Sequence, residues 1–378
     1  MQSTHFTISF HHFIPPFHST MKFFRRMIES TLFPEYLTPK RKTFSSKHSF
    51  SEESMKIFLT GGAGYIGSAC TEYLLDRGYD VTVFDGLITG HRQAVDPRAK
   101  FIYGNLEDRA SLFKYLSEGQ YDAVMHFAAF SLVGESMKNP GKYFKNNLAN
   151  AINLADAAIA GNVKTFVFSS TAATFGEPSE IPIRETTPQN PINPYGESKL
   201  CFEKALRWYS DLHGMKYAAL RYFNAAGATE NYGEDHNPET HLIPILLQVA
   251  AGKRPKAMLF GDDYDTPDGT CIRDYIHILD LAQAHEKALF APASGHYNLG
   301  TGSGYSVKQI LNAARKVTGH PIPADVVPRR PGDPPRLIAC SDKARSELGW
   351  TPQFEDPEII IESVWKWMKK HPDGYQGA

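Results

Sequence analysis

From Met55 onward, short apolar runs alternate with longer stretches in which apolar and polar residues recur at helical spacing. The runs that we interpret as buried strands are residues 56–60, 80–84, 123–127, 165–169 and 217–222. Strands that alternate with helices in this way form a parallel sheet, because each crossover helix returns the chain to the same edge. The pattern therefore predicts an α/β fold, a Rossmann-type doubly wound parallel sheet with right-handed crossovers.

The pattern changes on both sides of this region. After about residue 224 it loosens into segments rich in proline and glycine, which predicts a smaller C-terminal α/β substrate domain. We expect the sheet domain to span residues 55–230, with a return segment near 274–295, and the smaller substrate-binding domain to occupy mainly 231–378.

Residues 1–54 show no sustained period of 2 or 3.6 residues. We therefore expect a disordered extension, or a start codon placed too far upstream. The segment contains His5, His11, His12 and His18, but a histidine-rich composition alone is only a compositional hint of metal binding. We assign no metal site.

The composition narrows the class of ligand. Lysine and arginine number 40 against 41 aspartates and glutamates, which gives a formal net charge of -1. A chain without surplus positive charge is not expected to bind nucleic acid or an anionic membrane, so a small-molecule ligand is favoured. No run approaches the roughly 18 to 20 uncharged apolar residues of a membrane span. The four cysteines lie far apart without a C-x-x-C pair, so we expect reduced thiols in a cytoplasmic protein.

A glycine-rich segment follows the first predicted strand. Residues 60–67 read TGGAGYIG, in which Gly61, Gly64 and Gly67 have the spacing of a dinucleotide-binding turn. Glycines serve there because the turn needs unusual dihedrals, the backbone approaches the pyrophosphate closely, and the helix packs tightly on the strand. The next strand ends at Asp85, about 20 residues on, where a carboxylate accepts hydrogen bonds from the adenosine ribose. A 2′-phosphate would meet like charge there, so the pattern favours NAD over NADP.

A second set of polar residues is placed to perform chemistry. Tyr195 and Lys199 are four residues apart, so on a helix they share one face. The strand at 165–169 leads into Thr171 at the carboxyl edge of the sheet, where a doubly wound fold binds its ligand. We expect these three side chains to converge beside the nicotinamide. Lys199 and the positive nicotinamide ring would both lower the pKa of the Tyr195 phenol, making it a general base near neutral pH.

A general base and a hydride acceptor suffice to oxidise a secondary alcohol to a ketone. Elimination of water would need further acid and base groups. Thr171 is followed by Ala172 and Ala173, without a carboxylate. The pattern therefore disfavours a 4,6-dehydratase.

Further motifs identify the family that the chain resembles. They are HFAA at 126–129, VGES at 133–136, NN at 146–147, RYFN at 221–224, RDYIH at 273–277 and RRPGD at 329–333. With these motifs, the chain from Met55 almost to its C-terminus resembles the extended short-chain dehydrogenase/reductase family, and within it the UDP-sugar 4-epimerases. The resemblance implies that Tyr195 is the base, Lys199 its activator and Thr171 its hydroxyl partner.

The resemblance also implies the residues that contact each ligand. Those implied for NAD are Gly61, Gly64, Tyr65, Ile66, Gly67, Asp85, Asn105, Leu106, Phe127, Ala128, Asn146, Tyr195, Lys199 and Tyr222. Those implied for the UDP-sugar are Thr171, Tyr195, Asn224, Leu242, Arg273, Arg330 and Asp333. Asn224, Arg273 and Arg330 would hold the pyrophosphate, since guanidinium groups suit phosphate oxygens, and Asp333 would hold the uridine ribose. A homodimer is implied as well, through helices near residues 147–160 and 195–213.

Some positions depart from the family pattern. Gly86 stands where many members have asparagine after the ribose-binding aspartate, and Asn105 replaces an aspartate often found near the adenine. Leu337 stands where members differ between tyrosine and a small residue, a position that gates N-acetylated sugars. Its intermediate size leaves UDP-GlcNAc open as a substrate.

The implied function is the interconversion of UDP-glucose and UDP-galactose through a 4-keto intermediate, with NAD bound throughout. One alternative is a related enzyme that epimerises UDP-xylose, UDP-arabinose or UDP-GlcNAc, or that dehydrates a nucleotide sugar. The other is a non-catalytic NAD-sensing regulator, because a fold does not fix a function.

Overall fold

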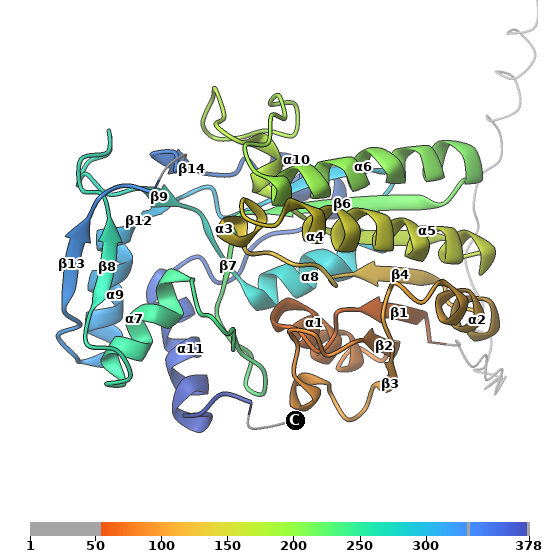
Figure 1. The fold of residues 1–378 in the computed structure, drawn as a ribbon, viewed down its shortest axis with the longest axis horizontal. Coiled ribbons are helices and arrows are strands. Elements are labelled where there is room, and N and C mark those ends of the chain that lie inside the picture. The colour runs from red at the N-terminus through yellow and green to blue at the C-terminus, as the bar shows by residue number, and fades with distance from the viewer. Residues whose placement is uncertain (1–53, 331–332, 376–378) are drawn as a thin grey trace, which may run out of the picture. The chain divides into compact units, whose positions relative to one another are not determined.

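Seven parallel strands form the central sheet of the computed structural model, which describes residues 54–330 and 333–375 (Figure 1). The strands are β1 (Lys56–Thr60), β2 (Asp80–Asp85), β3 (Lys100–Tyr103), β4 (Ala123–His126), β5 (Thr165–Thr171), β6 (Lys216–Tyr222) and β11 (Gly295–Leu299). Their order is β11-β6-β5-β4-β1-β2-β3, and every neighbouring pair is parallel. The predicted doubly wound parallel sheet is confirmed, although the apolar pattern did not identify the edge strands β3 and β11.

Both faces of the central strands are buried, which explains why these strands are continuous apolar runs. In β1, Ile57 and Leu59 belong to one apolar core and Phe58 to another, and none of the three has exposed surface. Helices α1 (Tyr65–Leu75) and α8 (Ile278–Ala288) cover the first face (Figure 1). Helices α2 (Arg109–Gly119), α5 (Asn150–Ala160) and α6 (Pro194–His213) cover the second.

A smaller group of elements packs around a third apolar core, at the left in Figure 1. The group comprises α7 (Leu242–Ala250), β8 (Ala257–Phe260), α9 (Val307–Thr318), β13 (Ala324–Val327) and α11 (Pro357–Lys370). Strand β8 pairs in parallel with β13. Since α8 and β11 follow α7 and β8 along the chain but pack with the large sheet, the chain crosses between the two groups more than once. The division into two domains stays a prediction.

Short strands and helices complete the described part of the chain. One small sheet pairs β7 (Asn224–Ala226) with β10 (Tyr275–His277). Another has the strand order β12 (Tyr305–Ser306), β9 (Ile272–Arg273) and β14 (Arg336–Leu337). The remaining helices are the 3-10 helices η1 (Arg92–Ala94) and η3 (Ala172–Phe175), the π-helix η2 (Phe144–Ala149), α3 (Val133–Ser136), α4 (Pro140–Tyr143) and α10 (Asp342–Leu348).

The strand order creates a place for a ligand. From β1 the chain adds β2 and β3 on one side of the sheet, and then β4, β5, β6 and β11 on the other. The connections after β1 and β4 therefore leave in opposite directions. Doubly wound sheets bind their ligands at such a switch point, outside the carboxyl ends of the strands.

The expectation of a disordered extension before Met55, with its four histidines, falls on residues 1–53, outside the described residues. Within residues 54–330 and 333–375, no helix has the length and apolar character needed to cross a membrane.

Candidate active site

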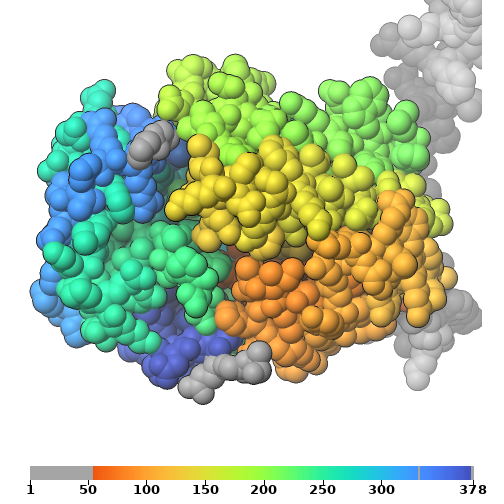
Figure 2. Space-filling view, viewed as in Figure 1, coloured from red at the N-terminus to blue at the C-terminus, as the bar shows by residue number. Residues whose placement is uncertain are grey.

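A cavity of about 900 Å³ lies where the turn after β1 meets the ends of β4 and β5. In the space-filling view, the surface is hollowed between the yellow and the teal parts of the chain (Figure 2). The predicted site residues that line this cavity are Gly61, Gly64, Tyr65, Ile66, Gly67, Asp85, Asn105, Leu106, Phe127, Ala128, Asn146, Thr171, Tyr195, Lys199, Tyr222, Asn224, Arg273 and Asp333. Leu242 and Arg330 are predicted site residues that do not line it.

The glycines of the turn allow backbone segments to pack closely against one another. Gly61 has a φ of 82°, and a Cβ there would lie 2.4 Å from the backbone nitrogen of Ala128. A Cβ on Gly67 would lie 2.1 Å from the carbonyl oxygen of Gly61. Gly64 begins helix α1 without a side chain that caps it, so the N–H groups of the first turn face the cavity uncapped. Such a helix start suits a pyrophosphate, and the residues present fit a dinucleotide.

Asp85 lies at the end of β2 and holds the turn in place. Its carboxylate accepts hydrogen bonds from the backbone N–H groups of Ala63, at 3.0 Å, and Leu87, at 2.7 Å. Burial raises the pKa of Asp85, and these two hydrogen bonds oppose the rise. Each carboxylate oxygen has a second lone pair, so Asp85 keeps the capacity to accept a ribose hydroxyl.

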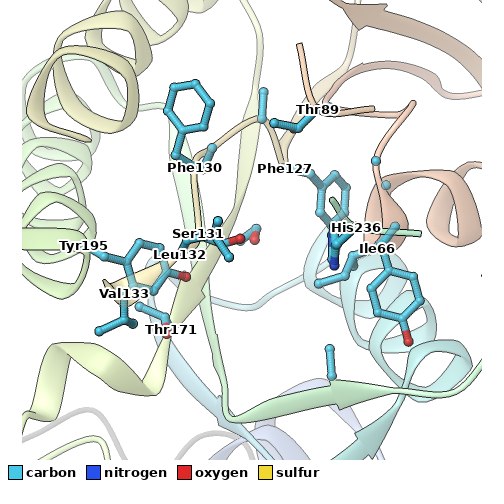
Figure 3. Close-up of a pocket in the computed structure, with 18 of the residues that line it drawn as sticks. Ile66, Thr89, Phe127, Phe130, Ser131, Leu132, Val133, Thr171, Tyr195 and His236 are labelled. Carbon is cyan, nitrogen blue, oxygen red and sulfur yellow. The ribbon is translucent and has the colours of Figure 1, made fainter. Parts of the chain in front are cut away.

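Helix α6 positions Tyr195 in its first turn. The helix starts at Pro194, and the side chain of Asn193 accepts a hydrogen bond from the N–H of Gly196 at 2.8 Å. Thr171 is the last residue of β5, and Figure 3 draws it beside Tyr195, with Ile66 and His236 on the other side of the cavity. Tyr195, Thr171 and the glycine turn therefore line the same cavity.

Burial dominates the acid–base properties of this group. It raises the pKa of Tyr195, although the hydrogen bond with Thr171 opposes the rise. Burial lowers the pKa of Lys199 to about 7, against the charge of Glu203. The Lys199 ammonium donates to the Ser169 carbonyl oxygen at 2.9 Å. This differs from the expectation that Lys199 lowers the pKa of Tyr195, because the ammonium is turned to the backbone of β5 and the phenol is desolvated.

A buried ion pair holds α6 against the sheet. The guanidinium of Arg221, on β6, donates two hydrogen bonds to the Glu203 carboxylate of α6, at 2.9 and 2.6 Å. Ser170 of β5 donates a third at 2.5 Å. Because the side chains of Glu203 and Arg221 are 1% and 2% exposed, this link ties β5, β6 and α6 together directly behind Lys199.

Two asparagines of η2 lie beside helix α6. Asn147 lies in the π-helix η2 and clamps Phe130, accepting from its N–H at 3.0 Å and donating to its carbonyl oxygen at 2.9 Å. Asn146 donates to the side chain of Asn147 at 3.0 Å and lines the cavity. A π-helix often occurs at a functional site, since its extra residue redirects side chains.

The structure also places the predicted substrate residues. Arg273 pairs with Asp333 and donates to the carbonyl oxygen of its neighbour Ile272 at 2.7 Å. Asn224 and the gate position Leu337 line the cavity next to this pair.

Two of the predicted substrate residues, Arg330 and Leu242, do not line the cavity here, and their contacts with the substrate stay predictions. The exposed guanidinium of Arg330 lies 4.0 Å from the ring centroid of Phe260, a cation–π contact that holds it outside the cavity lining. Leu242 is the first residue of α7 and packs against the third apolar core. Their motif positions are adjacent to cavity residues in sequence, but packing turns their side chains to other surfaces.

Several residues of the cavity wall were not predicted from the sequence. One group is Leu132, Glu135, Lys142 and Tyr143, joined by hydrogen bonds from Lys142 and Tyr143 to the Glu135 carboxylate at 2.7 and 2.9 Å. The other is the loop of residues 233–241, which contributes Glu234, Asp235, His236 and His241. A signal existed for the loop, since its acids and histidines recur as E-x-H-x-x-E-x-H.

Comparison with known proteins shows which family the chain matches. Residues 57–300 match the NAD dependent epimerase/dehydratase family. A UDP-glucose 4-epimerase of Lacticaseibacillus casei is 54% identical over 327 residues, which cover 85% of this chain and 99% of that protein.

Solved structures agree with the sequence relatives. A crystal structure of a UDP-glucose 4-epimerase with 52% identity superposes with a TM-score of 0.83, covering 85% of this chain and 100% of the other. The UDP-glucose 4-epimerase of Bifidobacterium longum, solved in complex with NAD+ and UDP, has 38% identity and a TM-score of 0.80, with coverage of 85% and 100%.

Proposed function

The chain belongs to the NAD dependent epimerase/dehydratase family, and we propose that it interconverts UDP-glucose and UDP-galactose. The observation that carries the proposal is the cavity that brings Tyr195 and Thr171 to the glycine turn. Relatives of more than 50% identity that carry the name UDP-glucose 4-epimerase support this choice within the family.

Tyr195 is the proposed base that removes the proton from the 4′-hydroxyl of the sugar. Thr171 holds the phenol and the sugar hydroxyl in line, since it shares a side-chain hydrogen bond with Tyr195. Lys199, buried behind them, orients this wall through its bond to the Ser169 carbonyl oxygen. Removal of water from the site strengthens each of these electrostatic contacts.

The residues proposed to hold NAD are the glycine turn for the pyrophosphate and Asp85 for the adenosine ribose. Bound there, NAD would supply the acceptor and, once reduced, the donor of the hydride at C4′, and the positive nicotinamide ring of its oxidised form would lower the pKa of the Tyr195 phenol.

The UDP portion is proposed to lie between Asn224, Arg273 and Asp333. Arg273 offers a forked donor for phosphate oxygens, and Asp333, its partner here, offers a carboxylate for ribose hydroxyls. Binding energy from UDP would hold the keto sugar through its turnover without fixing the orientation of the ring.

Two observations bear on the alternatives. Ala172 and Ala173 line the cavity where a dehydratase would need acid and base groups, which disfavours dehydration. Leu337 lines the cavity at the gate position, so UDP-GlcNAc stays a candidate second substrate.

The proposal is tested with purified protein and no added NAD. Incubation with UDP-galactose should yield UDP-glucose, and Tyr195→Phe should lower kcat by about 100-fold or more, the effect of a lost general base, while UDP binding persists. UDP-xylose and UDP-GlcNAc are incubated in parallel. The proposal would be rejected if the protein converted neither UDP-glucose nor UDP-galactose. An inactive protein that still binds NAD would indicate a sensor.

We propose a homodimer formed through α5 and α6. Helix α6 exposes two large apolar side chains, Trp208 at 56% and Leu212 at 71%, and such side chains are common in interfaces. Light scattering at micromolar concentration should give the mass of two chains. We also propose that the protein is cytoplasmic, since all four of its cysteines are unpaired.

A further inference from the structure

The loop of residues 233–241 gathers two carboxylates and two imidazoles at one point. Glu234, His236, Glu239 and His241 each bring one possible ligand atom, and these atoms all lie within 4.8 Å of one another. Glu234 Oε1 is 3.0 Å from Nδ1 of His236 and 2.7 Å from Nδ1 of His241. Glu239 Oε1 is 3.1 Å from the same His241 nitrogen.

The two carboxylates are buried, and the basic groups beside them are the imidazoles of His236 and His241. The side chains of Glu234 and Glu239 are each 3% exposed, and within the described residues neither is paired with a lysine or an arginine. Taking an ionised carboxylate out of water is costly unless a positive charge compensates it. A protonated His241 would offset one of the two negative charges, and a divalent cation would compensate both.

The donors and their geometry fit one divalent transition metal. Imidazole nitrogen and carboxylate oxygen bind Zn²⁺ at about 2.0 to 2.2 Å, so tetrahedral ligand atoms are about 3.4 Å apart. The three atom pairs given above, at 2.7 to 3.1 Å, are all closer than that spacing, and shifts of less than an ångström would open the cluster to hold an ion. A mixed set of two nitrogens and two oxygens suits zinc better than calcium or magnesium, which prefer oxygen alone.

The surroundings hold the ligands in place. Glu239 Oε1 accepts hydrogen bonds from the backbone N–H groups of Thr240 and His241, both at 2.7 Å, so the ion would bind the other carboxylate oxygen, Oε2. The ring of His236 meets that of Tyr65, in the first turn of α1, edge to face at 6.2 Å. Support of this kind orients metal ligands.

We propose that Glu234, His236, Glu239 and His241 form a binding site for one zinc-type divalent ion. The ion would fix the loop that walls the cavity opposite Thr171 and Tyr195, next to the glycine turn. It is a structural site, closed by four protein ligands, and it does not depend on which sugar the protein accepts.

The competing explanation is that the four side chains satisfy one another. A charged His241 between the two carboxylates would then complete the cluster with no metal. The two explanations differ in what happens when zinc is added to the protein.

The experiment uses the full chain, stripped with a chelator and dialysed. Zinc is titrated by calorimetry, and bound metal is measured by mass spectrometry. The variants are Glu239→Gln, which keeps an acceptor for the two N–H groups, and His236→Ala, at a partly exposed side chain. The controls are His320→Ala, at an exposed histidine outside the cavity, and a His11→Ala/His12→Ala double variant, which removes sequence histidines from the N-terminal segment.

We expect one tight equivalent of zinc in the wild type and in both controls. Loss of a ligand should weaken the affinity by more than about 100-fold, beyond the effect of removing a supporting residue. Zinc at 100 times its Kd should raise the Tm of the wild type by about 5 °C. Substituted Co²⁺ should give the intense visible bands of a four-coordinate ion.

Two results would overturn the proposal. One is a wild type that binds no zinc equivalent tightly. The other is tight binding that survives both Glu239→Gln and His236→Ala, or that disappears only in the His11→Ala/His12→Ala control. Circular dichroism of each variant shows whether it is folded, and the second ligand variant decides the outcome if the first does not fold.

Discussion

The carboxylate of Glu203 lies behind the proposed catalytic lysine, where almost no water reaches it. Burial alone would raise the pKa of Glu203, but the hydrogen bonds and charge of Arg221, with His296 and Ser170, outweigh it. The net pKa is therefore below its ordinary value. Since the folded pKa is depressed, ionised Glu203 stabilises the fold above the ordinary carboxyl pKa, and this stabilisation is lost as the pH falls through the lowered value.

Glu203→Gln should lower the free energy of unfolding at pH 7 by roughly 3 to 5 kcal/mol, because it leaves the charge of Arg221 buried and unpaired. The gap between wild type and variant should begin to shrink as the pH falls below about 4.3, the ordinary glutamate pKa at which the unfolded chain takes up a proton, and should shrink until the pH passes the lowered pKa of the folded carboxyl. Urea unfolding over a series of pH values measures both effects.

Glu358→Gln provides the control for this prediction. Glu358 pairs with Lys316 at 2.7 Å, but their side chains are 37% and 71% exposed. An exposed pair contributes little, so this variant should not differ measurably from the wild type. Equal stability of Glu203→Gln and the wild type at pH 7 would contradict the assignment.

Helix α6 carries the proposed chemistry at its very start, so its first turn is more important than its length. Asn193 caps that turn, and Pro194 occupies the first helical position, where its missing N–H has no cost. Tyr195 follows directly. A frayed first turn would move the phenol away from Thr171.

Asn193→Ala should cost about 1 kcal/mol of stability, the usual effect of a lost cap. It should also lower kcat by about 10- to 100-fold, since a small displacement of a reacting group is costly. Asn193→Ser can still cap the helix, so it should retain most of the stability and most of the kcat of the wild type. Unfolding curves and steady-state rates provide the measurements.

The N-cap of α11 provides a control that tests the effect of a lost cap on stability apart from its effect on activity. Asp356 accepts a hydrogen bond from the N–H of Glu358 at 2.8 Å, far from the proposed chemistry. Asp356→Ala should cost a similar amount of stability with kcat unchanged. If Asn193→Ala kept full activity, Tyr195 would not depend on the cap.

Across the whole molecule, the end of the described chain supports the wall of the cavity. The hydroxyl of Tyr375 accepts from the N–H of Gly233 at 3.0 Å and donates to its carbonyl oxygen at 3.2 Å. Its own N–H donates to the carboxylate of Asp235 at 2.8 Å. Gly233 also lies so close to Trp367 of α11 that a Cβ would be 2.3 Å from the indole ring. Residues more than a hundred positions apart therefore hold the loop of residues 233–241.

Tyr375→Phe should speed amide hydrogen exchange in residues 233–241 and lower the free energy of opening there by about 1 to 2 kcal/mol, the value of its hydrogen bonds. Exchange followed by mass spectrometry of peptides reports this loop directly. Tyr103→Phe, at a tyrosine 71% exposed on an edge strand, should leave it unchanged. An unchanged loop in Tyr375→Phe would mean that Trp367 alone supports it.

Local rules in the sequence were enough for the central strands and for the glycine turn. Strands β1, β2, β4, β5 and β6 are apolar runs because both of their faces are buried, and Gly61 is required by a positive φ. The edge strands escaped the pattern for the opposite reason. In β3 the side chain of Tyr103 is largely exposed, and β11 reads GHYNL, with too few apolar residues to mark a buried strand.

The sequence by itself determined the fold class, the dinucleotide-binding turn and the spacing of Tyr195 and Lys199, because each depends on neighbours along the chain. Only the tertiary structure decided that Arg330 stacks on Phe260, that Lys199 turns to the Ser169 carbonyl, and that residues 233–241 wall the cavity. These outcomes depend on which distant segments pack together and on how far they exclude water. The local periodicity of the sequence does not predict either.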